Sequence, residues 1–512
     1  MKKSKEVKMT REQIEKKKKR IIKTFITILA VIIVAIIGYK VNDYIILDKN
    51  KTINLVINNK NVTSNLKKDI FIQDDEIYIS KQDLGNFFDK YIYEDTENNQ
   101  IVTTYNNKIG AISLEENKIN INGSEKETYA HAIEKDDTIY IPIQELENVY
   151  GIEIKYIESS KVLTIDSTSK EQKKAIITKN VAVKSSKRFI AKTIDRAEKG
   201  SYVVVISEEN GYAKIRTENG KIGYVKSNKI ANTVVVREEI QETKQIEGKV
   251  NLVWDYYSTV ASAPNRTGET MDGVNVVSPA FFYLDSNGNL KENIGESGKA
   301  YIEWAHNNGY KVWPMVQNAG DGMLQVTSKI MNDYNKRQKL IEDIVTVCVN
   351  YNLDGVNIDF ENMKEEDKDL YSRFIIELTP RIKDMGLVVS VDVTAPDGGE
   401  TWSMCFDRHV IGDVADYIIF MAYDQYGASS NKSGTTAGYN WVELSLNKFL
   451  KTEEIKSEKI ILAIPLYARL WTEDSSGKVV KQSAVSIKNI DSIIPSDAER
   501  KWDEDLYQYY VE

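Results

Sequence analysis

Seven short apolar runs recur along the second half of the chain, and helical patterns lie between most of them. They read VNLVW, VNVVSP, KVWPMV, LDGVNIDFE, LVVSVDVTAP, DYIIFMAYD and KIILAIPLY. Near-continuous Val/Ile runs are typical of parallel strands that are buried on both faces. Strands that alternate with helices imply right-handed βαβ units. The segment 249–512 therefore predicts a (β/α)8 barrel, a TIM barrel, in which the eighth strand is not visible.

The fourth run carries polar residues at alternate positions, namely Asn357, Asp359 and Glu361. Alternate residues of a strand share one face, so we expect these side chains to point into the barrel and the apolar residues between them to face the helices. Two carboxyl groups this close cannot cheaply both be charged, so one pKa should rise. Glu361, at the C-terminal end of its strand, is then a candidate general acid. The alternative is a structural or metal-binding carboxylate pair.

The motif that contains these residues resembles a motif of a known protein family. DGVNIDFE resembles the DxxDxDxE motif of glycoside hydrolase family 18, the chitinase-like barrels, and MAYDQYG at Met421–Gly427 resembles its MxYD segment. Phe281-Phe282-Tyr283 and Tyr467-Ala-Arg469-Leu-Trp471 also fit the family. The resemblance spans about 250–512. It is greatest to the bacterial cell-wall and spore-cortex hydrolases of the family, which often join the barrel to wall-binding modules.

The resemblance implies substrate-assisted catalysis with retention of configuration. Glu361 would protonate the glycosidic oxygen while the N-acetyl oxygen of the sugar attacks the anomeric carbon. Asp359 would orient the acetamide group, and Tyr423 would donate a hydrogen bond to its oxygen with Asp424 beside it. The implied substrate is a polysaccharide that contains N-acetylglucosamine. The implied substrate-binding residues are Phe282, Tyr283, Trp313, Gln317, Met421, Arg469 and Trp471.

Two features depart from the family pattern. Asn357 stands where the broad motif has Asp, and its amide could donate a hydrogen bond to Asp359 and favour the ionised form of that carboxyl. The cell-wall subfamily commonly has Asn here, which favours peptidoglycan over chitin.

The eighth strand of the family barrel usually brings a Trp to the sugar-binding floor. No such strand is visible before residue 512. Either the sequence is a fragment of a longer protein, which we favour, or that strand is lost.

The N-terminal segment has a charge pattern of its own. Residues 1–23 carry eleven Lys or Arg and three Glu, whereas the whole chain has a net charge of −8. The basic tail precedes a mostly apolar stretch without charge between Lys23 and Lys40, which predicts a membrane anchor over 24–41. The positive-inside rule places the tail in the cytoplasm and the remainder outside the cell. A buried helix and a cleaved signal peptide are the alternatives.

Two modules are predicted between the anchor and the barrel. IYISKQDLGNFF at 77 and IYIPIQELENVY at 139 form a repeat, and the α+β segment 51–166 resembles the copper amine oxidase N-terminal-like domain. The short alternating strands of 175–232 resemble a bacterial SH3-like domain, which would bind the cell wall or act as a spacer. Two Cys and three scattered His argue against a metal site, so no cofactor is expected.

The sequence therefore predicts a membrane-anchored extracellular glycosidase that acts on peptidoglycan or cortex glycan. Its acidic body argues against binding nucleic acid. Two alternatives stay open: a non-catalytic glycan-binding or scaffold protein on a chitinase-like barrel, and a chitinase. Non-catalytic glycan-binding proteins on this barrel typically lack the catalytic Glu, whereas Glu361 is present here.

Overall fold

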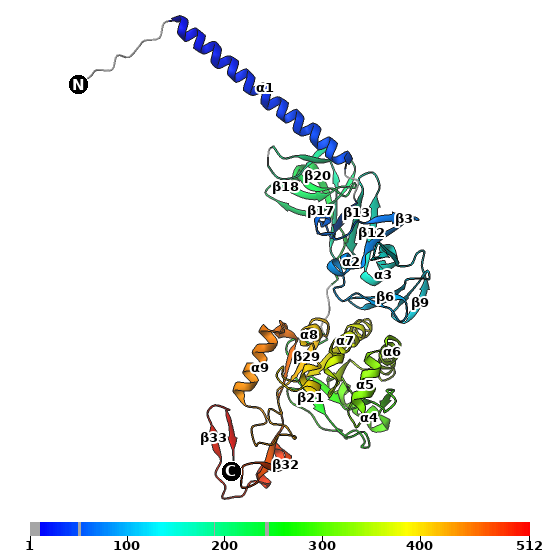
Figure 1. Cartoon of the computed structure of the whole chain (residues 1–512), viewed down its shortest axis with the longest axis vertical. Coiled ribbons are helices and arrows are strands. Elements are labelled where there is room, and N and C mark those ends of the chain that lie inside the picture. Colours follow the sequence, from blue (N-terminus) through cyan, green and yellow to red (C-terminus); the bar gives the residue numbers. More distant parts are fainter. Residues whose placement is uncertain (1–10, 50–52, 189, 241–244) are drawn as a thin grey trace, which may run out of the picture. The chain divides into compact units, whose positions relative to one another are not determined.

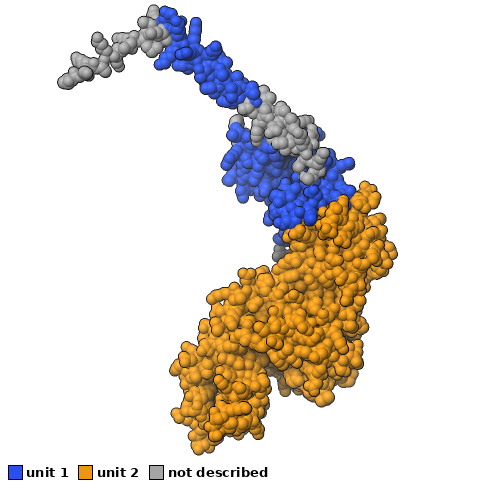
Figure 2. Space-filling model, in the orientation of Figure 1, with its two compact units in different colours: residues 1–72, 152–239 blue, residues 73–151, 240–512 orange. Residues whose placement is uncertain are grey.

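The computed structural model describes residues 11–49, 53–188, 190–240 and 245–512. The chain forms two compact units, residues 1–72 with 152–239 and residues 73–151 with 240–512 (Figure 2). The predicted anchor, 24–41, falls within helix α1 (Arg11–Lys49), and the side chains of residues 35–49 lie outside the described part. Among the described residues, no helix combines the length and the apolar character needed to cross a membrane.

The first unit is built mainly of strands. β1 (Asn54–Ile57) lies parallel to β13 (Val162–Ser167), which pairs on its other side with β12 (Ile152–Ile157). A separate seven-stranded sheet has the order β16-β15-β19-β18-β17-β14-β20. Its strands are β14 (Gln172–Ile177), β15 (Val181–Lys184), β16 (Thr193–Ala197), β17 (Tyr202–Glu209), β18 (Tyr212–Arg216), β19 (Ile222–Lys226) and β20 (Ile230–Arg237). Apart from one short helical turn at Ser227–Lys229, residues 175–232 form strands and loops, and their likeness to an SH3-like domain stays a prediction.

The repeat seen in the sequence forms a local pair in the second unit. β4 (Glu76–Ser80) is followed by α2 (Lys81–Phe87), and β11 (Thr138–Pro142) is followed by a short helical segment that ends in α3 (Glu147–Tyr150). β4 and β11 are antiparallel, and Ile79 pairs with Ile141, its equivalent in the repeat. The two copies therefore meet at equivalent residues.

The strands predicted for the barrel all form, and neighbouring strands are parallel. They are β21 (Leu252–Asp255), β22 (Val276–Pro279), β25 (Lys311–Val312), β26 (Met315–Gln317), β27 (Gly355–Asp359), β28 (Val388–Val393), β29 (Tyr417–Met421) and β30 (Ile460–Ala463). β25 and β26 are the two halves of the third predicted strand, which Trp313 and Pro314 interrupt. A short strand after β22, β23 (Phe282–Leu284), also pairs in parallel with β26, and in antiparallel with β24 (Leu290–Glu292).

Helices cover the outer face of these strands (Figure 1). They are α4 (Gly295–Asn307), α5 (Met323–Met331), α6 (Tyr334–Asn350), α7 (Lys368–Lys383), α8 (Arg408–Val414) and α9 (Tyr439–Lys451). Val356, Ile358 and Phe360 of the fourth strand run are fully buried in the core between strands and helices. The prediction that these apolar residues face the helices is confirmed.

The described strands leave the barrel open on one side. β21 and β30 are edge strands, and no strand of the described residues pairs with their outer sides. Two antiparallel hairpins follow β30, formed by β31 (Tyr467–Glu473) with β32 (Val479–Ser486) and by β33 (Lys501–Asp503) with β34 (Gln508–Tyr510). Leu462, Ile464 and Leu466 are exposed along this edge. The eighth strand that was not visible in the sequence is also not found in the described part of the chain.

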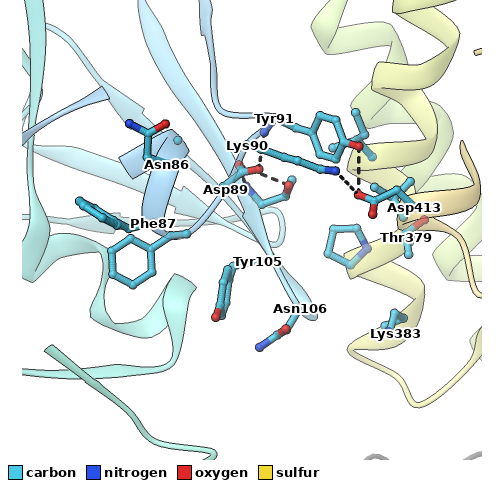
Figure 3. A pocket seen from close by; sticks show the side chains of 16 residues that line it. Asn86, Phe87, Asp89, Lys90, Tyr91, Tyr105, Asn106, Thr379, Lys383 and Asp413 are labelled. Atoms are coloured by element: carbon cyan, nitrogen blue, oxygen red, sulfur yellow. Dashed lines mark hydrogen bonds and ion pairs between the residues drawn. The ribbon is translucent and has the colours of Figure 1, made fainter. Parts of the chain in front are cut away.

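Within the second unit, residues 73–151 contact the barrel helices through a polar junction. Glu377 on α7 is fully buried, and it binds Arg337 of α6 (Nε to Oε2, 2.9 Å) and accepts a hydrogen bond from the Tyr93 hydroxyl at 2.9 Å. Tyr91 and Lys90 both reach the Asp413 carboxylate at 3.0 Å, beside a cavity of about 480 Å³ (Figure 3). The junction is therefore made by specific hydrogen bonds and ion pairs.

Candidate active site

The N-terminal end of β27 is held by tight packing and charge. A side chain at Gly355 would place its Cβ 2.6 Å from the carbonyl oxygen of Val388 and 2.8 Å from the Trp313 ring, so only glycine fits. The preceding residue, Asp354, binds His306 at 2.9 Å and Lys311 at 2.8 Å. The first acid of the DxxDxDxE-like motif therefore fixes the end of the strand that lies away from Glu361.

Strand register builds one row of side chains across three strands. Tyr283 pairs with Gln317, and Gln317 pairs with Asp359, in parallel register. Residues paired in this way point to the same side of the sheet. The Gln317 amide donates a hydrogen bond to Asp359 Oδ2 at 2.8 Å. The structure thus brings together these three of the predicted site residues.

Glu361 follows β27, and its backbone is fixed by Asn318. The side-chain Oδ1 of Asn318 accepts a hydrogen bond from the Glu361 N–H at 2.8 Å, and Nδ2 of the same side chain donates to the Glu361 backbone carbonyl oxygen at 2.9 Å. Burial, together with the charges of Asp359 and Asp424, raises the pKa of Glu361 to about 8. A carboxyl group with that pKa carries its proton at neutral pH and can donate it.

Asn357 is fully buried, and its side chain makes three hydrogen bonds. Its Oδ1 accepts from the Trp254 indole N–H at 2.8 Å and from the Ser278 hydroxyl at 3.2 Å. Its amide donates to Oδ1 of Asp392, on β28, at 2.8 Å. The predicted hydrogen bond from Asn357 to Asp359 is wrong, because the neighbouring strand offers a carboxylate that the sequence pattern did not reveal.

Tyr423 and Asp424 follow β29. The Tyr423 ring packs edge-on against Trp254 and Tyr467, each with 6.2 Å between ring centroids. Burial raises the pKa of Tyr423, and the nearby carboxylates of Asp392, Asp359 and Glu361 raise it further. The Tyr423 hydroxyl therefore keeps its proton and can act as a hydrogen-bond donor beside the carboxyl groups.

Asp424 is held by the chain that follows β30. Its Oδ1 accepts hydrogen bonds from the Tyr467 hydroxyl at 2.6 Å and from Arg469 at 2.7 Å. Trp471, two residues further along β31, donates its indole N–H to the Gly434 carbonyl at 3.0 Å. Arg469 and Trp471 both line a cavity of about 640 Å³ between the C-terminal hairpins. Met421, the last residue of β29, is buried.

Two predicted substrate-binding residues do not reach the site. Trp313 is fully buried and stacks on Tyr417 at the N-terminal end of β29, with 5.6 Å between ring centroids. Phe282 is fully buried in the core that faces the helices. The predicted sugar contacts of Trp313 and Phe282 are therefore wrong. Trp313 lies near the N-terminal ends of the strands, and Phe282 has the opposite orientation to Tyr283.

Several residues of the site were missed in the sequence. Asp392 lies in the run LVVSVDVTAP, where a single Asp among apolar residues was the available signal. Asn318 lies two residues after the end of the predicted run KVWPMV, where barrel loops begin. Ser278 had no distinguishing pattern. Among the described residues, no group of three or more His, Cys, Asp or Glu is arranged to hold a metal ion.

Two curated proteins of Bacillus subtilis are similar in sequence to part of this chain. YvbX of Bacillus subtilis, an uncharacterized glycosylase, is 28% identical over 217 residues, which cover 41% of this chain and 61% of YvbX. The cortical fragment-lytic enzyme of B. subtilis is 24% identical over 147 residues, 28% of this chain and 33% of that enzyme. The chain thus spans less than two thirds of the length of these curated relatives.

One solved structure aligns with part of the chain, and two family models match it. The chitinase of Chromobacterium violaceum aligns with a TM-score of 0.46 and 20% identity, over 51% of this chain and 82% of its own. Residues 56–165 match the copper amine oxidase N-terminal domain. Residues 253–512, about half of the chain, match glycosyl hydrolases family 18. This protein therefore belongs to glycosyl hydrolase family 18, through the barrel that carries Asp359 and Glu361.

Proposed function

We propose that the chain hydrolyses a cell-wall glycan that contains N-acetylglucosamine, by substrate-assisted catalysis with retention of configuration. The observation that carries the proposal is Glu361, whose pKa of about 8 leaves it protonated beside Asp359 at the C-terminal end of a barrel strand. Family membership and the relatives named above, among them a cortical fragment-lytic enzyme, support a cell-wall or chitin-type glycosidase.

The proposed reaction has two steps. Glu361 gives its proton to the glycosidic oxygen, and the acetamide oxygen of the substrate attacks the anomeric carbon as the bond to the leaving group breaks. Asp359 accepts a hydrogen bond from the acetamide N–H and stabilises the positive charge of the oxazolinium ring that forms. The Tyr423 hydroxyl donates a hydrogen bond to the acetamide oxygen. Glu361 then removes a proton from water, which attacks the same carbon and restores the acetamide.

Release of reducing ends tests this function. The full chain and its Glu361→Gln variant are incubated separately with purified peptidoglycan and with chitin. We expect release from peptidoglycan by the unaltered chain, and at least about 100-fold less by Glu361→Gln, because a missing general acid typically costs 10²–10⁴-fold. Release from chitin alone would identify a chitinase. Binding to peptidoglycan without release from either glycan would favour the non-catalytic glycan-binding alternative.

We also infer that the N-terminal segment holds the protein at the cell membrane with the barrel outside. Support comes from the uncharged stretch between Lys23 and Lys40 and the basic cluster that precedes it. Cell fractionation, followed by protease treatment of intact cells, checks this location. We expect the chain to be recovered in the membrane fraction and the barrel to be digested by protease added to intact cells. Recovery in the soluble fraction would contradict the inference.

A further inference from the structure

The family motif does not include Asp392, yet this residue lies among the proposed catalytic groups. Ser390 of β28 pairs with Asn357 of β27 in parallel register. Side chains two residues apart share a face, so Asp392 lies alongside Asp359 on the inner side of the sheet. Asp392 is 1% exposed, and the Asn357 amide donates to its Oδ1 at 2.8 Å. Its Oδ2 is buried and accepts no hydrogen bond from any described residue.

Asp392 and Asp359 cannot both be ionised cheaply. The ionisable groups that face Asp392 are Asp359, Glu361 and Tyr423 from the strand ends and Tyr371 from α7. None of them is a cation. Burial raises the pKa of Asp392 well above its usual range, and the charge of Asp359 raises it further, while the hydrogen bond from Asn357 opposes the shift. One of the two carboxyl groups is therefore protonated and the other is ionised.

Burial decides which carboxyl group keeps that proton. Burial raises the pKa of Asp359 as well, but this residue is partly exposed and receives a hydrogen bond from Gln317, which favours its ionised form. Asp392 is the more deeply buried of the two, and a charge there would lose more solvation. When Oδ2 of Asp392 is protonated, this oxygen can also donate a hydrogen bond. We propose that Asp392 is a positioning residue that holds this proton, donates it in a hydrogen bond to Asp359, and so keeps Asp359 ionised.

This role rests on the proposed function and explains the Asn at position 357. With Asp392 on the next strand supplying a carboxyl group, a third Asp at 357 would add an unneeded charge to the buried row. The Asn357 amide instead donates to Asp392 and accepts from Trp254, which fixes the orientation of the Asp392 carboxyl group. Asp392 therefore replaces, from β28, the acid that the broad motif carries on β27.

Two substitutions at Asp392 separate positioning from packing. Asp392→Asn keeps a donor toward Asp359, and we expect it to retain kcat within about tenfold. Asp392→Leu keeps the branching at Cγ but has larger methyl groups and no donor, so Asp359 would become harder to ionise and kcat should fall by about 100-fold at a nearly unchanged KM. Asp416→Asn, at the N-terminal end of β29, is the control and should leave the pH profile of kcat unchanged. Equal kcat values and pH profiles for the Asn, Leu and unaltered proteins would overturn the proposal.

Infrared difference spectra test the proton itself without any turnover. The comparison uses Glu361→Gln and the Glu361→Gln/Asp392→Asn double variant at pH 7, because this background removes the proton of Glu361. We expect a protonated carboxyl band in the single variant that is lost in the double variant. An unchanged band would place the proton elsewhere and overturn the proposal. If no glycan is cleaved but this band is lost, the proposed function fails while the assignment of the proton stands.

Discussion

Asn318 holds the Glu361 backbone from both sides, through an N–H to Oδ1 distance of 2.8 Å and an Nδ2 to carbonyl oxygen distance of 2.9 Å. The Asn318 amide also donates to the Thr327 hydroxyl of α5 at 3.1 Å. Asn318 itself is 3% exposed. The backbone of the proposed general acid is therefore fixed by a buried side chain that lies directly after the neighbouring strand, β26.

Replacement of Asn318 should impair catalysis more than folding. Asn318→Ala removes both hydrogen bonds to Glu361, each worth about 1 kcal/mol, and we expect kcat to fall about 10- to 100-fold. Steady-state kinetics on peptidoglycan fragments, with circular dichroism as a check on folding, would measure this. The matched control is Asn332→Ala, which loses hydrogen bonds to Ser328 and Asp367 but none to Glu361. Equal kcat values for the two variants would contradict the role of Asn318.

The raised pKa of Glu361 predicts two pH dependences. As a general acid Glu361 must be protonated, so kcat should fall as pH rises through about 8. Between the ordinary pKa of 4.5 and about 8, the folded state keeps a proton that the unfolded state has lost. The contribution of Glu361 to stability therefore decreases as pH rises across this window.

Chemical denaturation at pH 5 and pH 8 checks the stability part of this prediction. Glu361→Gln has no proton to lose, so the variant should gain stability relative to the unaltered chain as pH rises from 5 to 8. A stability difference that stays constant across this range would show that the Glu361 pKa is not raised.

Trp313 should matter for stability and not for substrate binding. Trp313→Ala removes a fully buried ring next to Gly355 and Tyr417, and we expect a loss of about 3–5 kcal/mol in the free energy of unfolding. Trp402 is 49% exposed, so Trp402→Ala should change stability far less. Urea unfolding of both variants measures the effect. A raised KM in Trp313→Ala with unchanged stability would restore its predicted sugar contact.

The Arg337–Glu377 ion pair should contribute strongly at the junction with residues 73–151. Glu377→Ala leaves Arg337 buried without its carboxylate, which typically costs about 3–5 kcal/mol. Tyr93→Phe removes one hydrogen bond to Glu377 and should cost about 1 kcal/mol. A double-mutant cycle at Arg337 and Glu377 would be compared with the exposed Lys339–Asp343 pair, where little coupling is expected. Similar coupling energies for the two pairs would refute this prediction.

The sequence by itself determined the strands and helices of the barrel and the inward direction of Asp359 and Glu361. These follow from local rules, because apolar runs and the alternation of side chains depend only on neighbours in the chain. The resemblance to the family wrongly implied a sugar-binding role for Trp313 and Phe282, because a resemblance in sequence does not show toward which end of the barrel a side chain lies or where a strand is interrupted.

Only the tertiary structure decided which residues of different strands meet. Asp392 contacts Asn357 because parallel register places Ser390 beside Asn357, and no feature of either strand alone sets that register. Asn318 contacts Glu361 through the parallel register of β26 and β27, and Tyr467 contacts Asp424 because the segment after β30 packs against the residues that follow β29. Sequence patterns carry the direction of a side chain within its own strand, whereas hydrogen bonds between strands depend on packing across the whole barrel.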